Sequence, residues 1–288
     1  MSRALIFDCD GVLGDTELHG HLPAFNQMWA ELGVPWQWSA KEYAGKRQIG
    51  GGKERMASLF EDARFLRVVH PPAGEPERNR LLVLWHRRKT MIYKSLVEEG
   101  RIPVRSGVRR LAEEALDRGW ALAVASTSAP DSVETMLCRA VGPVTAARFS
   151  LILAGDVVRA KKPAPDIYRL AAARLGLSPA HCVAVEDSRN GVAAAVAAGM
   201  KCVVTVTDST REDDFSGADL VLTGLGDPGG EISRVLANRS TAQPGDWFTA
   251  GDLEAVLAAQ HPVGAKQDQR SGCAPSRTPT RWAPEVRP

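Results

Sequence analysis

The chain begins with an apolar run that ends in acidic residues, LIFDCDGVLGDT at residues 5–16. Asp8 and Asp10 are two positions apart, so the alternation of a strand points both carboxylates to the same side. Gly11 follows at once and lets the chain turn sharply. Because an unpaired buried charge is costly, two carboxylates at a strand end indicate a divalent cation or a shared proton transfer. The alternative is a strand followed by a solvated turn, since Asp and Gly are common turn residues.

The composition is typical of a soluble globular protein. The 288 residues are 44% hydrophobic and 24% charged, and the formal net charge of +2 excludes a large basic field of the kind that binds nucleic acid. Five cysteines, none in a Cys-x-x-Cys pair, argue against a zinc site or disulfide framework and favour a reducing compartment. Neither a signal peptide nor a long apolar segment is visible, so we expect a cytoplasmic protein with no membrane partner.

Strand-like and helix-like segments alternate over much of the chain. Short apolar runs occupy residues 4–7, 120–125, 151–154, 182–185, 202–206 and 220–222. Helical patterns lie between them, at residues 108–118, 131–139, 166–175 and 191–198. This alternation predicts an α/β fold with a doubly wound parallel sheet.

Residues 16–102 break that rhythm, with helical patterns only, at 21–32, 53–60 and 77–99. We therefore expect a helical cap domain over 16–102, inserted into a core domain formed by 1–15 and 103–240. Residues 241–288 are expected to be a C-terminal extension with one helix at 252–260. The Pro, Ser and Arg content after about 262 predicts disorder there.

Further polar clusters follow the later apolar runs, where a parallel α/β sheet binds its ligands. Ser126-Thr127-Ser128 offers hydroxyls and free N–H groups for a phosphate, or a plain helix cap. Lys161-Lys162-Pro163 offers a cation for a phosphoryl group, although a lysine pair is usually a solvated surface. Glu186-Asp187-Ser188 adds carboxylates, which with Asp8 and Asp10 form an oxygen-rich site suited to Mg²⁺.

The order Asp-x-Asp-Gly, Ser-Thr-Ser, Lys-Pro and Glu-Asp-Ser resembles that of the haloacid dehalogenase-like hydrolase superfamily, over about residues 4–222. The resemblance implies a Rossmann-like core with an inserted helical cap of the C1 type, Mg²⁺ as cofactor and an aspartyl-phosphate intermediate. It also implies roles by position: nucleophile Asp8, general acid/base Asp10, phosphate ligands Ser126 and Lys162, and metal ligands Asp8, Asp10 through its carbonyl, Glu186 and Asp187.

The second aspartate favours phosphate ester cleavage, in which a leaving alkoxide must be protonated. The dehalogenase branch of the superfamily lacks this acid and needs no metal. The phosphonatase branch uses a cap lysine as a Schiff base, a role that the sequence leaves open for Lys53.

A finer resemblance is to the CbbY group, carried by DTE at residues 15–17, AFN at 24–26, GGGKERM at 50–56, AGDVV at 154–158 and LGDP at 225–228. The group resembles β-phosphoglucomutase but acts as a sugar bisphosphate phosphatase, with xylulose-1,5-bisphosphate as its characteristic substrate. The sequence departs from the group at Gly14, at an extra residue around His19-Gly20, and at residues 44–47, which lack a Leu-rich pattern.

The cap should contribute to substrate binding. Lys53 and Arg55 follow three glycines and offer flexible backbone and positive charge together for a phosphate that is not cleaved. An exposed helix start with ordinary surface charges is the alternative, and His21 can equally be structural. We expect substrate contacts from Glu17, His21, Lys53, Arg55, Thr127 and Ser188.

These observations predict a Mg²⁺-dependent sugar phosphatase that acts as a monomer on a small phosphorylated sugar. A phosphosugar mutase of the β-phosphoglucomutase type differs in shielding the phosphoenzyme from water, and the sequence does not decide between the two. A noncatalytic interaction protein of the same fold is opposed by the intact Asp8, Asp10, Lys162 and Asp187. A basic segment after residue 261 carries too few charges to predict contact with nucleic acid or a membrane surface.

Overall fold

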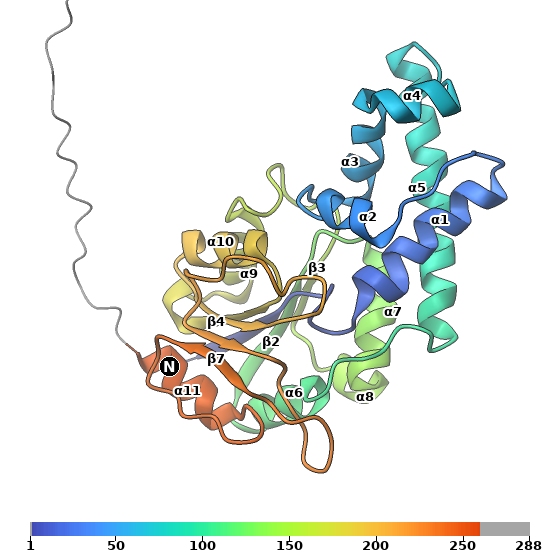
Figure 1. Cartoon of the computed structure of the whole chain (residues 1–288). Helices are drawn as coiled ribbons and strands as arrows, with labels where there is room; N and C mark the ends of the chain where they lie inside the picture. The colour runs from blue at the N-terminus through green and yellow to red at the C-terminus, as the bar shows by residue number, and fades with distance from the viewer. Residues whose placement is uncertain (1, 260–288) are drawn as a thin grey trace, which may run out of the picture.

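The computed structural model describes residues 2–259 and is built around a sheet of seven strands in the order β3-β2-β1-β4-β5-β6-β7 (Figure 1). Neighbouring strands are parallel except for β6 and β7, which are antiparallel. The strands are β1 (Arg3–Phe7), β2 (Trp120–Ala125), β3 (Leu151–Leu153), β4 (Cys182–Glu186), β5 (Lys201–Thr205), β6 (Leu220–Leu222) and β7 (Val235–Asn238).

All of the predicted strands are confirmed, and β7 was missed. Its apolar run at residues 235–237 is as long as that of β6 and could have been detected, but its side chains are mostly exposed, with Leu236 57% accessible, as at the edge of a sheet. The inner strands β1, β2, β4 and β5 are apolar almost throughout because both faces of the sheet are covered.

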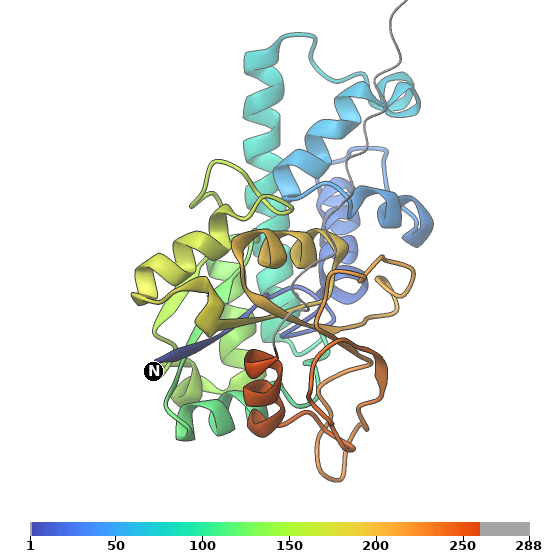
Figure 2. The same ribbon diagram turned by 90° about the vertical axis from the view of Figure 1, so that its left-hand side faces the viewer.

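Two hydrophobic layers lie on opposite faces of the sheet. Along β1, Leu5 and Phe7 enter one layer and Ala4 and Ile6 enter the other. The first layer includes side chains from α6 (Val108–Asp117), α7 (Pro130–Val141) and α11 (Ala250–Ala258), and the second from α9 (Asp166–Leu175) and α10 (Arg189–Ala198). Helices therefore cover both faces (Figures 1 and 2), which confirms the doubly wound arrangement.

The segment between β1 and α6 is helical, as predicted, and stands above the sheet (Figure 2). It packs around an aromatic cluster in which Trp29 and Trp38 meet edge to face at 4.7 Å between ring centroids. Its elements are η1 (Glu17–His21), α1 (Leu22–Glu31), α2 (Ala40–Lys46), α3 (Gly52–Ala57), η2 (Ser58–Glu61), α4 (Ala63–Val69) and the long α5 (Glu75–Glu98).

Two details of this segment differ from the sequence prediction. The predicted helix at 53–60 is divided into α3 and η2. Helices α2 and α4 were missed because they are short and depend on their caps, a capping box at Ser39 and the Asp62 carboxylate. His19 and Gly20, where the sequence reading places an extra residue, lie in η1, which is a π-helical turn.

The end of the described chain contains α11, which confirms the helix predicted there. The short α8 (Pro143–Ala146) and η3 (Pro179–His181) complete the elements. Residues 260–288, for which disorder was expected after about 262, lie outside the described residues. Within residues 2–259, the helices are too short or too polar for any of them to cross a bilayer.

Candidate active site

The site begins where β1 ends. The Asp8 N–H continues the ladder by donating to the Val185 carbonyl at 2.9 Å, which ties the turn after β1 to the end of β4. Gly11 has a φ of +73°, and a Cβ built there would lie 2.0 Å from Oδ2 of Asp187. The glycine after the two aspartates therefore supplies the turn and the space for a carboxylate of the neighbouring strand.

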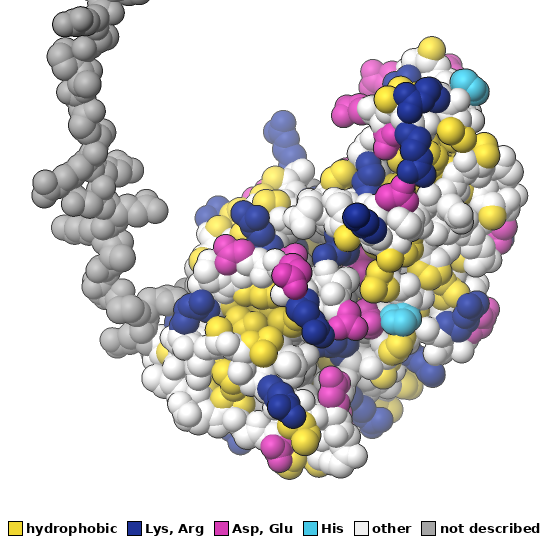
Figure 3. All heavy atoms as spheres, in the orientation of Figure 1, with side chains coloured by type: hydrophobic (Ala, Val, Ile, Leu, Met, Phe, Trp, Pro, Cys, Tyr) yellow, Lys and Arg dark blue, Asp and Glu magenta, His cyan; other side chains and the backbone are white. Residues whose placement is uncertain are grey.

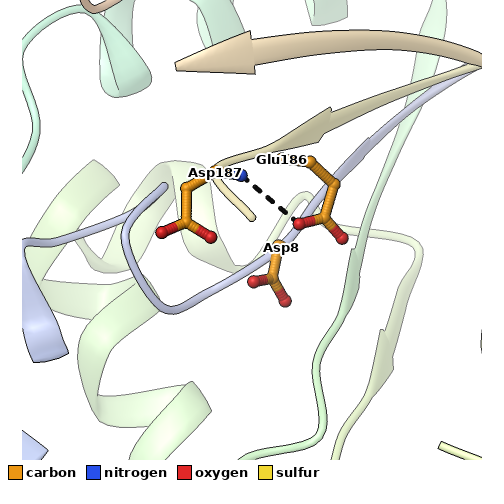
Figure 4. A group of neighbouring side chains, drawn as sticks. All are labelled: Asp8, Glu186 and Asp187. Atoms are coloured by element: carbon orange, nitrogen blue, oxygen red, sulfur yellow. Dashed lines mark hydrogen bonds between the residues drawn. The ribbon is translucent and has the colours of Figure 1, made fainter. Parts of the chain in front are cut away.

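Three buried carboxylates meet at this edge of the sheet, as Figure 4 shows. Asp8, Glu186 and Asp187 each place one oxygen such that all three lie within 4.8 Å of one another. The Asp187 N–H donates to the Glu186 carboxylate at 3.3 Å (Figure 4). A set of hard carboxylate oxygens at this spacing fits a small divalent cation such as Mg²⁺.

Lys162 lies in the same cluster and is buried, with only 8% of its surface exposed. Its Nζ donates to Asp8 at 2.9 Å and to Glu186 at 2.5 Å, and Tyr168 also donates to Glu186. The interpretation of Lys161-Lys162 as a solvated pair therefore does not hold for Lys162, which faces the acids.

Burial dominates the electrostatics of the acidic cluster. Desolvation raises the pKa of Asp8 to about 8, with Lys162 opposing this shift and the neighbouring acids adding to it. The pKa of Asp187 is raised well above its usual range, mainly by burial and to a lesser extent by repulsion from Asp8 and Glu186. One lysine does not balance three close carboxylates, so a bound cation would stabilise this arrangement.

Asp10 lies in a separate hydrogen-bond cluster. Its carboxylate accepts hydrogen bonds from the hydroxyls of Thr16, at 2.6 Å, and Ser128. It also pairs with Nε2 of His21 at 2.7 Å. Burial raises the pKa of Asp10, but His21 and these hydroxyls together bring it well below its usual range. Asp10 is thus held as a carboxylate.

His21 is itself oriented by the long helix α5. Its Nδ1 lies 2.6 Å from Nζ of Lys89, and its ring stacks on Tyr93 at 4.5 Å between centroids. Lys89 is buried, and desolvation lowers its pKa to about 8. A chain of contacts therefore runs from α5 through His21 to Asp10.

Two adjoining cavities, of about 70 and 40 Å³, lie between the helical insertion and the sheet edge. Both are lined by Asp10, Arg55 and Thr127. The larger one is also lined by further predicted site residues, namely Asp8, Glu17, Lys162, Asp187 and Ser188.

The remaining predicted residues occupy different positions. Ser126 is buried, and its hydroxyl accepts from the Ser128 N–H at 3.1 Å. Arg55 forms a bidentate salt bridge with Glu17, with both hydrogen bonds 3.0 Å long, and Tyr43 donates to the same carboxylate. Lys53 is absent from the lining of both cavities and pairs with Asp156 of the core at 2.9 Å.

Several contributing residues were missed from the sequence. Thr16 and Ser128 stand inside motifs that were quoted, but the Ser128 hydroxyl was considered only as a phosphate donor or helix cap, and neither hydroxyl was expected to bond Asp10. Lys89 interrupts the apolar stripe of α5 between Trp85 and Ile92, and a charge on such a stripe is the signal that would have found it. Tyr168 and Tyr43 carry no sequence signal, because only the packing brings them to the acids.

The family model for haloacid dehalogenase-like hydrolases matches residues 2–199, and the chain belongs to this family. Within it the chain is of the CbbY type. It is 38% identical over 260 residues to the plasmid-encoded protein CbbY of Cupriavidus necator, covering 90% of this chain and 97% of that protein. It is 43% identical over 228 residues to a CBBY-like protein of Arabidopsis thaliana, covering 79% of this chain and 70% of that protein.

A solved structure agrees with this assignment. A mutant of CbbY from Rhodobacter sphaeroides, in complex with xylulose-1,5-bisphosphate, is 41% identical to this chain and superposes with a TM-score of 0.67. The match covers 78% of this chain and 95% of that chain.

Proposed function

We propose that this protein is a Mg²⁺-dependent phosphatase that hydrolyses a sugar bisphosphate through an aspartyl-phosphate intermediate. The observation that carries the proposal is the environment of Asp8, a buried carboxylate bonded to Lys162 at 2.9 Å and grouped with Glu186 and Asp187. The CbbY relative that holds xylulose-1,5-bisphosphate supports that compound as the first substrate to test.

Asp8 is proposed as the nucleophile. One of its oxygens attacks phosphorus, and the bond between phosphorus and the sugar oxygen breaks. Lys162 stabilises the negative charge on the phosphoryl group, with Ser126 and Thr127 as further donors near the same strand ends. Water then cleaves the aspartyl-phosphate, which releases inorganic phosphate and restores the Asp8 carboxylate.

Asp10 is proposed to handle protons in both steps. As a carboxylate it can accept a proton from the attacking water in the second step. In the first step it must carry a proton to the leaving sugar oxygen, which requires uptake of a proton when the anionic substrate enters. Thr16, His21 and Ser128 hold the carboxylate in place for both tasks.

Asp8, Glu186, Asp187 and the Asp10 carbonyl are proposed to hold Mg²⁺. Bound there, the ion neutralises negative charge on the phosphoryl oxygens and the surrounding acids. The converging buried oxygens of the three acidic side chains support this assignment.

The division into domains is also proposed, with a core of 1–15 and 103–240, a cap of 16–102 and an extension of 241–288. Backbone hydrogen bonds support a paired hinge, from Asp15 N to Pro103 O at 2.9 Å and from Arg105 N to Leu13 O at 3.1 Å. Glu17, His21 and Arg55 on the cap would contact the sugar, together with Thr127 and Ser188 on the core. Lys53 would join them from its position on the rim.

The test is phosphate release from a panel of sugar mono- and bisphosphates by the wild type and by Asp8→Asn. We expect Mg²⁺-dependent turnover by the wild type, fastest on a bisphosphate. Removal of the nucleophile should reduce kcat by about 10⁴-fold or more. Substantial turnover by a folded Asp8→Asn protein would contradict the assigned nucleophile, and isomerisation of a sugar monophosphate without phosphate release would favour a mutase.

A further inference from the structure

The larger cavity has a cationic side chain that the proposed function does not use. Arg47 follows the last turn of α2 and reaches across from the cap to the core, where it donates to the Ser209 carbonyl. Its side chain is 9% exposed and lines the cavity together with Asp8, Asp187 and Ser188.

Arg47 retains a buried donor without a partner. Three cationic side chains among residues 2–259 line this cavity, namely Arg47, Arg55 and Lys162. Among their buried nitrogens, only Nε of Arg47 has no hydrogen-bond partner. Its nearest acid is Asp213, whose oxygen is 3.9 Å from Nη2, at the outer limit of an ion pair. An unpaired buried N–H is unfavourable, so an entering anionic oxygen would be bound strongly there.

The other cations near the site are already committed. Arg55 is bonded to Glu17 through both terminal nitrogens, and its Nε donates to the Ile49 carbonyl at 3.0 Å. Lys162 is bonded to Asp8 and Glu186. Lys53 is paired with Asp156 outside the two cavities.

We infer that Arg47 binds the phosphate of the substrate that is not cleaved, and thereby selects bisphosphates over monophosphates. The inference rests on the proposed function, and it adds a substrate-binding residue that the proposed function does not include. A planar guanidinium suits this task, because it can keep its bond to Ser209 while offering a second N–H edge to phosphate oxygens. The same contact would bind the substrate, the cap and the core loop at 206–215 into one closed unit.

The test compares the wild type with Arg47→Gln on xylulose-1,5-bisphosphate, xylulose monophosphates and p-nitrophenyl phosphate. Loss of one charge-assisted hydrogen bond should lower kcat/KM on the bisphosphate by about 10- to 100-fold. Hydrolysis of the monophosphates and of p-nitrophenyl phosphate should hardly change, because they leave this subsite empty. The conservative Arg47→Lys variant should recover part of the lost preference, since it keeps a cation at this position.

Arg64→Gln is the matched control, because Arg64 is a cap arginine with a 58% exposed side chain that pairs with Glu42. It should leave the preference for the bisphosphate unchanged. An equal loss on all substrates in Arg47→Gln would overturn the inference and leave Arg47 with a role in cap closure alone. An unchanged preference would also overturn it.

A binding measurement separates this inference from the proposed function. If the wild type releases no phosphate from any substrate, the proposed function fails. The increase in melting temperature caused by xylulose-1,5-bisphosphate then decides the role of Arg47. The inference expects a larger increase for the wild type than for Arg47→Gln, and equal increases would overturn it.

Discussion

At the scale of single residues, the acidic cluster depends on two positions that carry no side chain. Gly11 leaves space for Asp187, and Gly191 leaves space for Glu186. A Cβ built on Gly191 would lie 1.9 Å from Oε2 of Glu186 and 2.0 Å from its Cδ. The carboxylate therefore lies directly against the first turn of α10, and any side chain at position 191 must displace it.

Gly191→Ala should consequently weaken both stability and activity. The steric conflict should cost about 1–3 kcal/mol of unfolding free energy, more than the gain in helix propensity of about 1 kcal/mol. Urea denaturation measures the first effect, and the Mg²⁺ concentration needed for half-maximal activity measures the second.

The matched control is Gly45→Ala in helix α2, where a Cβ would have no neighbour within 4 Å. It should stabilise the protein slightly and leave the Mg²⁺ requirement unchanged. Equal effects of the two substitutions would show that the close approach at Gly191 has no energetic consequence.

At the scale of elements, α5 is linked to Asp10 through the contacts of Lys89 with His21 and of His21 with Asp10. Lys89→Met should reduce activity without loss of stability. A buried ammonium is costly, so a methionine of similar length should leave the free energy of unfolding equal or higher. Without Lys89, His21 loses the partner on Nδ1 that orients its ring toward Asp10.

We expect kcat/KM to fall by about tenfold or more. A positioned acid or base contributes roughly 10²- to 10⁴-fold to the rate, and a misoriented Asp10 should lose part of that contribution. Arg87→Met, an exposed change on the same helix, is the control for a lost positive charge. Unchanged kinetics in a stable Lys89→Met protein would contradict the positioning role.

The same helix carries a histidine that should make stability depend on pH. Burial, followed by the positive charges of Lys89 and Lys53, lowers the pKa of His86 from 6.5 to about 4. At a pH between about 4 and 6.5, His86 is therefore protonated in the unfolded chain but neutral in the folded protein. Stability should therefore decrease as the pH falls from about 6.5 toward 4.

His86→Gln should reduce this slope in urea unfolding measured across that pH range. Because the His86 ring is only partly buried, the effect will be smaller than the full shift in pKa suggests. A slope that is identical in His86→Gln and the wild type would refute this assignment.

At the scale of the whole molecule, polar contacts hold the cap against the core on two sides of the cavities. On one side Lys53 pairs with Asp156 and Lys161 with Glu54, and on the other Asn190 donates to the Gln48 carbonyl at 3.2 Å. Over the face drawn in Figure 3, basic and acidic side chains are interspersed rather than gathered into one patch of a single sign. The contacts of Lys53, Lys161 and Asn190 thus join the helical insertion to the core beside the cavities.

Metal binding should stabilise the whole molecule as well as activate it. EDTA should remove phosphatase activity and Mg²⁺ should restore it. At about 100 times its dissociation constant, a ligand of the folded state adds roughly 2.7 kcal/mol of stability, which corresponds to a rise of several degrees in melting temperature. In Asp187→Asn, which lacks one of the converging carboxylates, this rise should be lost or much smaller.

A melting temperature that does not respond to Mg²⁺ would argue against the metal site. Full activity after exhaustive chelation would argue against the metal requirement of the proposed mechanism.

The sequence alone determined the core of this protein and the acids at its sheet edge. Apolar runs alternating with helical patterns predicted a parallel sheet, and a parallel sheet brings its carboxyl ends to one edge. The positions of Asp8, Lys162, Glu186 and Asp187 follow from that topology, because each is one or a few residues from a strand end or a helix start. Local periodicity and motif spacing carry this information.

Only the tertiary structure decided which side chains pair in the cap. The sequence suggested Lys53 and Arg55 as free phosphate ligands, whereas the folded chain pairs Arg55 with Glu17 and Lys53 with Asp156. Lys89 contacts His21 across 68 positions, and Arg47 reaches Ser209 across 162 positions. Such contacts depend on how separate helices pack and on the side-chain rotamers that this packing selects. No local pattern in the sequence encodes either of these.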